Sequence, residues 1–215
     1  MRISICILFV FSLTKMYSQN NSSTPDFYWQ HGVKKYSKDI KPNVFYLTLI
    51  NESLNDSIQN KQRDQEILDL LKNYELTIEH KGISDDKIGY VFYRKLIFQN
   101  KAMDSLMVKD ISEKMYSYDK IQFFGPQIYD IDTYYGAGLQ RTLDITFKAK
   151  TTKEAIEKIV KKYKLEVIGE FPTHQTIAVR CTNVYGLEII NLTTKIQEES
   201  CVDKTLNHLY IQNTF

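Results

Sequence analysis

The chain has 215 residues, of which 28 are Lys or Arg and 26 are Asp or Glu. Loss of residues 1–19 would remove Arg2 and Lys15 but no acidic residue, leaving 26 of each sign. A chain without net charge has no electrostatic reason to bind nucleic acid or an anionic membrane surface. Neither partner is therefore expected once residues 1–19 are removed. The remainder of about 190 residues fits one or two domains.

The first residues have the pattern of a secretory signal peptide. Arg2 gives a basic start, and an apolar run of about eleven residues follows at 3–13, inside the roughly 7–15 of a signal-peptide core. The run is shorter than the roughly 20 residues of a membrane span. We therefore predict a signal peptide at 1–19, a flexible leader at 20–25, and export to the periplasm or the extracellular space. An ordinary amphipathic strand is the alternative.

Residues 26–132 are interpreted as a first α+β repeat. Its amphipathic helix is predicted at 64–74, where Ile67, Leu68 and Leu71 fall on one side. The other predicted elements are a strand at 44–50, a polar loop at 51–63, strands at 76–80 and 90–98 around a turn at 84–86, a helix at 106–116 and a strand at 121–129. The order of elements is β-α-β-β-α-β.

Residues 139–215 repeat this order more clearly. Leu143, Ile145 and Phe147 alternate with polar residues, which predicts a half-buried strand. Thr151 to Glu154 has the spacing of a capping box and opens a helix. The remaining predicted elements are strands at 165–171 and 176–181 around a turn at 172–174, a helix at 185–199 and a strand at 202–209.

The predicted fold class is therefore α+β, with two tandem ferredoxin-like β-α-β-β-α-β sandwiches. Each has a four-stranded antiparallel sheet with its two helices on one face. Residues 136–138 (Gly-Ala-Gly) are interpreted as a short linker between the repeats. A helix of at least about 15 Å separates Cys181 from Cys201, too far for a disulfide, so two free thiols are expected.

The sequence has no recognisable catalytic motif, and the chain is not predicted to be an enzyme. Four scattered histidines (His31, His80, His174 and His208) show no metal-ligand spacing, so no metal and no cofactor are expected. Asp130 and Asp132 are interpreted as part of a solvated loop rather than as an acid–base pair or a calcium site. Cys181 is interpreted as a small core residue rather than as an activated thiol.

The second repeat resembles the inhibitor-type propeptide of subtilisin-like serine proteases. The residues that carry the resemblance are 143–148 (Leu-Asp-Ile-Thr-Phe-Lys), 151–156 (Thr-Thr-Lys-Glu-Ala-Ile), 162–170 (Lys-Tyr-Lys-Leu-Glu-Val-Ile-Gly-Glu) and 202–208. Lys164 stands where glycine is usual in that family. Phe27, Tyr28 and Trp29, with Gly32 and Lys34, also resemble the aromatic opening of prodomain-bearing secreted proteases of Bacteroidetes-type bacteria.

The resemblance implies a partner and a site. The open face of the sheet would lie on a subtilisin-like serine protease, and the C-terminal segment would run through the substrate cleft as an added strand. That segment consists of Tyr210, Ile211, Gln212, Asn213, Thr214 and Phe215. Phe215 would occupy the primary specificity pocket, and a frayed terminus is the alternative interpretation of the same residues.

Two functions follow from these observations. In the first, the chain is a non-catalytic exported protein that acts as a protease inhibitor or folding chaperone through its C-terminal segment. In the second, it is an exported binding or structural module that contacts another protein or a surface polymer. The abundance of aromatic residues is compatible with both, because aromatic side chains serve cores and interfaces alike.

Overall fold

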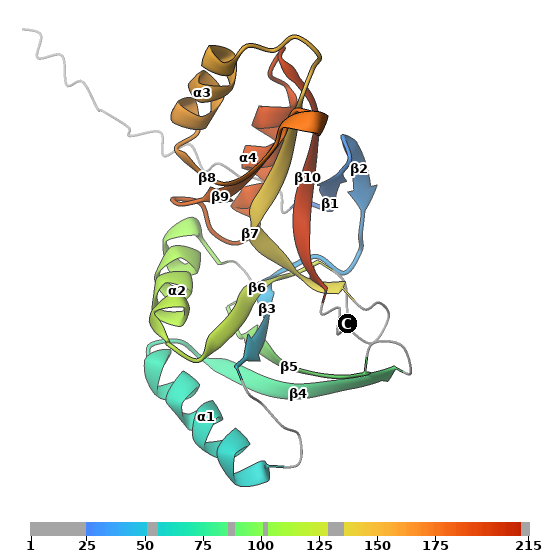
Figure 1. The fold of residues 1–215 in the computed structure, drawn as a ribbon. Coiled ribbons are helices and arrows are strands. Elements are labelled where there is room, and N and C mark those ends of the chain that lie inside the picture. Colours follow the sequence, from blue (N-terminus) through green and yellow to red (C-terminus); the bar gives the residue numbers. More distant parts are fainter. Residues whose placement is uncertain (1–24, 51–55, 86–88, 101–102, 129–135, 212–215) are drawn as a thin grey trace, which may run out of the picture.

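The computed structural model describes residues 25–50, 56–85, 89–100, 103–128 and 136–211. The predicted signal peptide, and the predicted leader apart from Pro25, lie outside these residues. Figure 1 shows the elements, whose bounds are β1 Phe27–Gln30, β2 Val33–Tyr36, β3 Lys41–Leu49, α1 Ser57–Leu70, β4 Leu76–Asp85, β5 Gly89–Phe98, α2 Ser105–Ser117, β6 Ile121–Gln127, β7 Gly136–Phe147, α3 Lys153–Lys162, β8 Leu165–Phe171, the 3-10 turn η1 Pro172–His174, β9 Thr176–Cys181, α4 Glu188–Gln197 and β10 Val202–Ile211.

The elements from β3 onward form two units with the same order of elements. The first unit runs β3-α1-β4-β5-α2-β6 and has the sheet order β4-β5-β3-β6, while the second runs β7-α3-β8-β9-α4-β10 and has the order β8-β9-β7-β10. Neighbouring strands pair antiparallel throughout. Both orders are those of a ferredoxin-like sandwich, so the predicted fold class is confirmed.

The first unit buries one face of its sheet against α1 and α2. Phe45 and Leu47 of β3 pack with Ile67 of α1, Ile111 of α2 and Phe124 of β6, and all five are at most 1% exposed. Phe45 and Phe124 stack with their ring centroids 5.0 Å apart. Offset aromatic pairs of this kind stabilise a core beyond the area that they bury.

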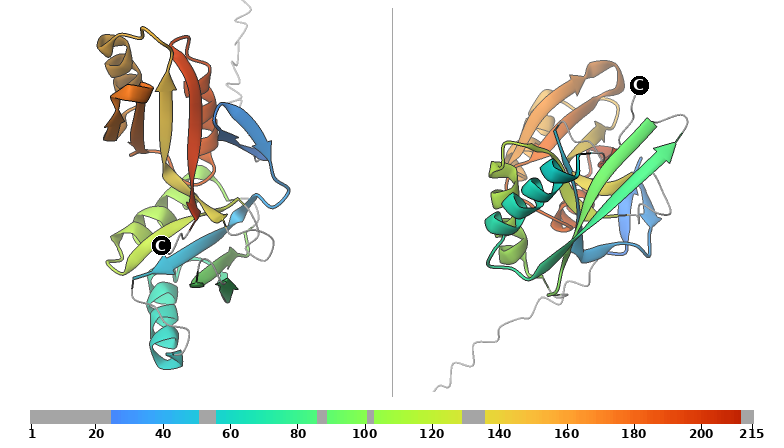
Figure 2. Two further views of the ribbon diagram at one scale, coloured as in Figure 1. Left: turned by 45° about the vertical axis from the view of Figure 1, so that its right-hand side comes forward. Right: turned by 90° about the horizontal axis from the view of Figure 1, so that it is seen from below.

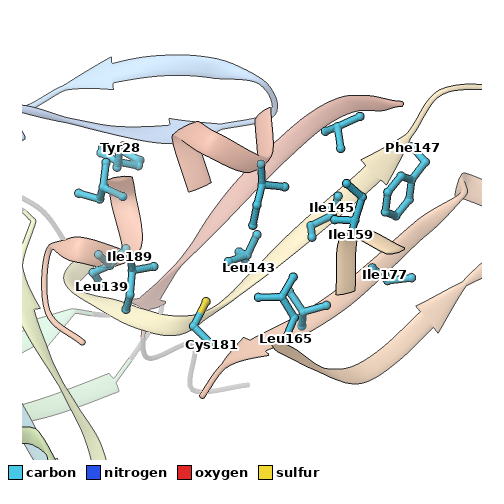
Figure 3. Packing of buried hydrophobic residues seen from close by; sticks show 14 of the residues in the cluster. Tyr28, Leu139, Leu143, Ile145, Phe147, Ile159, Leu165, Ile177, Cys181 and Ile189 are labelled. Atoms are coloured by element: carbon cyan, nitrogen blue, oxygen red, sulfur yellow. The ribbon is translucent and has the colours of Figure 1, made fainter. Parts of the chain in front are cut away.

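The second unit is built in the same way. Leu143, Ile145 and Phe147 of β7 point into a cluster with Ile159 of α3 and Ile189 of α4, as the alternation in the sequence predicts. Figure 3 shows these side chains together between the sheet and the helices. The N-cap of α3 is Thr152, whose hydroxyl accepts a hydrogen bond from the amide of Ala155 at 3.3 Å.

The two units are joined by backbone pairing rather than by a linker. Residues 136–138 belong to β7, and Gln127 at the end of β6 pairs with Gly138, so the interpretation of these residues as a linker is wrong. Glycine is required here for a steric reason: a Cβ on Gly138 would lie 2.2 Å from Cζ of Phe123. The result is one eight-stranded sheet that runs through both units.

Arg141 of β7 reinforces the junction from the helical side. Its guanidinium lies between the rings of Tyr116 in α2 and Tyr185 in the second unit, 5.1 and 4.4 Å from their centroids. The same guanidinium donates to the carbonyl oxygens of Cys181 and Thr182. Cation–π contacts and these hydrogen bonds therefore tie α2 to the second unit.

Helix α1 begins earlier than the sequence predicts. Residues 57–63, predicted as part of a polar loop, form its first turns, with Asp56 as the N-cap accepting from the amide of Gln59. Asn60 and Arg63 are buried in this stretch, and Arg63 donates to the carbonyl oxygen of Ile50. The prediction failed because polar side chains here are buried by tertiary hydrogen bonds, which apolar periodicity does not reveal.

The β1-β2 hairpin packs on the second unit, although residues 26–132 were assigned to the first. The indole Nε1–H of Trp29 donates to the hydroxyl of Thr194 in α4 at 2.9 Å. The backbone N–H of Trp29 donates to Oδ1 of Asn207 in β10 at 2.8 Å. Tyr28 is 4% exposed and belongs to the core cluster of the second unit. Figures 1 and 2 show the hairpin beside β10.

Candidate functional site

The candidate site lies on the face of the second sheet that α3 and α4 do not cover. Thr142, Asp144 and Thr146 alternate with the buried residues of β7 and are only half-buried. The corresponding face of the first sheet is closed, since Tyr46 of β3 and Tyr93 of β5 are at most 1% exposed. Within the described part of the chain, the open sheet face therefore belongs to the second unit.

A groove of about 400 Å³ crosses this open face. Its lining residues come from the hairpin, the four strands β7 to β10 and η1, and are His31, Asp144, Thr146, Phe171, His174, Thr176, Lys204, Thr205 and Leu206. A volume of this size is within the range of ligand-binding pockets. We refer to it below as the hairpin groove.

One wall of the hairpin groove is the tip of the β1-β2 hairpin. His31 and Gly32 form its two-residue turn with φ values of 51° and 78°, as a type I′ turn requires. The N–H of Gly32 donates to the carbonyl oxygen of Thr205 at 2.9 Å, which holds the tip on β10. A Cβ on Gly32 would lie 2.9 Å from Cβ of Lys204, so the contact requires glycine.

The opposite wall is the turn between β8 and β9. Pro172 stands in the first turn of η1, and Gln175 closes it in the left-handed conformation with φ 48°. The side chain of Phe171 remains 50% exposed beside this turn. On the floor between the walls, the hydroxyls of Thr146 and Thr176 are hydrogen-bonded at 2.8 Å.

In the hairpin groove the acidic residue has an ion-pair partner, whereas three nitrogen-bearing side chains have none among the described residues. Asp144 is the acidic residue of the lining, and its carboxylate lies 3.0 Å from Nε2 of His208. Nδ1 of His208 is in turn 2.9 Å from the hydroxyl of Thr142. Among the described residues, no hydrogen bond or ion pair engages the side chains of His31, His174 and Lys204. The groove therefore presents the nitrogen donors of His31, His174 and the Lys204 ammonium, beside one carboxylate that is engaged by His208.

Within the described ranges, no three His, Cys, Asp or Glu side chains are placed to hold a metal ion. Over the same residues, no helix is long and apolar enough to span a membrane.

Cys181 is a core residue. It is 1% exposed in the cluster of the second unit, and its burial raises the pKa of the thiol to about 12. At pH 8 roughly one part in ten thousand would be thiolate, the reactive form. Both described cysteines are free thiols, and Cys201 is half-buried.

We expect natively folded residues 20–215 to expose one reactive thiol to Ellman's reagent at pH 8 and two thiols after denaturation in guanidinium. Cys201→Ser should abolish the native signal, and Cys181→Ser should leave it unchanged. Loss of the native signal in Cys181→Ser would contradict the assignment of Cys181 to the core.

The structure describes two of the six predicted partner-binding residues. Tyr210 and Ile211 end β10 and pair with Gly138 and Gly136 of β7. Gln212, Asn213, Thr214 and Phe215 lie outside the described residues, as do Asp130 and Asp132. His80 is remote from the hairpin groove and lies in the first unit, 2.7 Å from the carboxylate of Asp64.

Sequence reasoning did not identify the hairpin groove. Its lining residues come from four separate stretches of the sequence, at residue 31 and within 144–146, 171–176 and 204–206, and no motif of fixed spacing connects them. The one local signal was the His-Gly pair, which is compatible with a tight hairpin turn between two short aromatic or β-branched runs. The fold alone brings His31 and His174 to one place.

The sequence matches no model of a known protein family and no curated protein. Among solved structures, the acetolactate synthase small subunit from Thermotoga maritima is similar at 9% sequence identity and a TM-score of 0.26. The similarity covers 78% of this chain and 96% of that chain. At this level the similarity carries no argument about function.

Proposed function

We propose that this protein is a non-catalytic binding module that docks a partner protein on the open face of its second sheet. Its partner, following the resemblance of residues 143–210, is a subtilisin-like serine protease. The observation that carries the proposal is the chemistry of that face. Phe171 and Leu206 supply apolar surface there, and ion pairs lie around them.

The ion pairs are placed as the polar rim of an interface. Arg180 and Glu166 are joined across β9 and β8 at 3.1 Å, and both remain 49% exposed. Asp144 and His208 pair across β7 and β10. Protein interfaces commonly have an apolar centre and a polar, solvent-accessible rim. A protein surface suits this face better than a small substrate does.

The end of α3 supports the resemblance to a protease propeptide. Lys164 occupies the position where that family usually has glycine, and its φ is 51°. Its amide donates to the carbonyl oxygen of Lys161, as in a helix C-cap that turns left-handed. Glycine is the residue that adopts this conformation without strain. Lys164 therefore has a left-handed backbone conformation that glycine would suit, although it is a lysine.

The position of β10 is also compatible with a segment that enters a protease cleft. β10 pairs with β7 and has no other partner among the described strands, so the chain leaves from an edge of the second unit. With Tyr210 and Ile211 engaged by β7, residues 212–215 are the part available to a cleft. Four extended residues reach about 13 Å, enough for a short product-like strand.

The proposal is tested by measuring inhibition of a panel of subtilisin-like proteases by residues 20–215. We expect an inhibition constant that rises at least about tenfold on deletion of residues 212–215, because the cleft contacts are lost. Phe171→Asp should raise it similarly by placing a charge at the centre of the docking face.

Ile58→Asp is the matched control, since Ile58 is 80% exposed on α1 and remote from the docking face. It should leave inhibition unchanged. A folded chain that inhibits no protease of the panel would overturn the assignment of the partner. Equal inhibition by the wild type and Phe171→Asp would overturn the assignment of the docking face.

A further inference from the structure

We propose that the hairpin groove is a recognition site for an acidic side chain flanked by an apolar one on the partner protein. The inference rests on the proposed function, because it concerns the chemistry of the partner that docks on the same sheet face. A carboxylate of the partner would bind the cationic end of the groove, and an aliphatic side chain would cover the apolar wall.

The cationic end is formed by residues from three separate elements. His31 lies at the hairpin tip, His174 in η1 and Lys204 on β10, and all three side chains are exposed. Cβ of Lys204 lies beside Gly32 at the hairpin tip, and the residue lines the groove.

Among the described residues, the neighbouring acidic group forms no ion pair with these donors. Asp144 is engaged by His208, which is itself oriented by Thr142, so this carboxylate has a partner on its own side of the groove. The hydroxyls on the floor are also engaged, since Thr146 bonds to Thr176 and Thr176 lies 3.1 Å from the carbonyl oxygen of His174. The remaining donors point to an acceptor that another molecule must supply.

The apolar wall argues against a simple inorganic anion. Phe171 is half-exposed, and Leu206 is half-buried on the neighbouring part of the sheet. Covering both surfaces with an aliphatic side chain adds a hydrophobic contribution that phosphate or sulfate cannot make. A carboxylate next to a leucine or similar residue satisfies both parts of the groove.

The test uses capped dipeptides and no protease, so its outcome is independent of the inhibition assay. The probes are acetyl-Leu-Asp-amide, acetyl-Leu-Asn-amide, acetyl-Ala-Asp-amide and inorganic phosphate. Binding to residues 20–215 is followed at pH 7 through the imidazole resonances of His31 and His174. We expect acetyl-Leu-Asp-amide to bind about tenfold more tightly than the other three probes, because each of them lacks the charge or the apolar group.

The variants are chosen to preserve the walls of the groove. His31→Asn removes an imidazole but suits the left-handed first position of a type I′ turn, and Lys204→Gln removes the charge but keeps the Cβ that lies beside Gly32. Each should weaken binding of acetyl-Leu-Asp-amide at least about fivefold. Lys153→Gln is the control, because Lys153 is 86% exposed on α3 and remote from the groove, and should not change it.

Three outcomes would overturn the inference. Equal binding of the Asp and Asn dipeptides would exclude recognition of the carboxylate. Binding of phosphate as tight as that of acetyl-Leu-Asp-amide would show a general anion site without an apolar requirement. Binding unaffected by Lys204→Gln would place the dipeptide elsewhere on the protein.

Discussion

Trp29→Ala is expected to lower the free energy of unfolding by about 3–5 kcal/mol, the usual range for truncating a buried tryptophan. The indole is 9% exposed, and its Nε1–H donates to Thr194. The same residue fixes β10 through its backbone, since its N–H donates to Asn207, whose side-chain amide donates in turn to Thr193. Removing the side chain leaves the hairpin held by Tyr28, by the backbone N–H of residue 29 and by the tip.

The measurement is guanidinium unfolding followed by far-ultraviolet circular dichroism, because Trp29 is the one tryptophan of the chain and its fluorescence is lost in the variant. Val33→Ala is the matched control on the same hairpin. Val33 is 57% exposed, so its truncation should change the unfolding free energy by less than about 0.5 kcal/mol. A cost for Trp29→Ala no greater than for Val33→Ala would contradict the docking of the hairpin.

The second unit could be predicted well because its local signals agree with its tertiary structure. Residues 143–147 of β7 alternate between apolar and polar, α3 has its apolar residues at helical spacing, and β8 and β9 have the predicted bounds 165–171 and 176–181. In such stretches the buried residues are the apolar ones that recur every second residue in a strand or at helical spacing in a helix. The element can therefore be predicted from the spacing of apolar residues in the sequence. The order of elements in both units followed from these local patterns.

The predictions that failed concern tertiary contacts. Gly136 and Gly138 suggest a linker, because glycine weakens strands. In the structure Gly138 lies in a strand, and the ring of Phe123 occupies the space that a side chain at this position would need. The hairpin was assigned by its position in the chain, while the hydrogen bonds of Trp29 attach it to the distant β10. The hairpin groove depends on the docking of the hairpin on β10, which explains why no pattern of spacing predicts it.

Gly125→Ala is expected to destabilise the protein by about 3 kcal/mol or more, at the upper end of the cost of overpacking. Its Cβ would lie 2.2 Å from the carbonyl oxygen of Leu139 and 2.8 Å from Cζ of Phe123. The first of these atoms belongs to the backbone of β7, which cannot withdraw without loosening the pairing between β6 and β7. The substitution should therefore weaken the junction between the two units.

Gly138→Ala provides the matched comparison, because the three atoms nearest to its Cβ would all belong to the ring of Phe123, with Cζ at 2.2 Å and Cε1 at 2.4 Å. Phe123→Leu should therefore recover part of the loss caused by Gly138→Ala, and less of the loss caused by Gly125→Ala. A double-mutant cycle on unfolding free energies measures this, with a coupling of at least about 1 kcal/mol expected for the first pair. Equal recovery at both glycines would show that the backbone of β7 yields at the junction, and that the two units are less rigidly joined than their shared sheet implies.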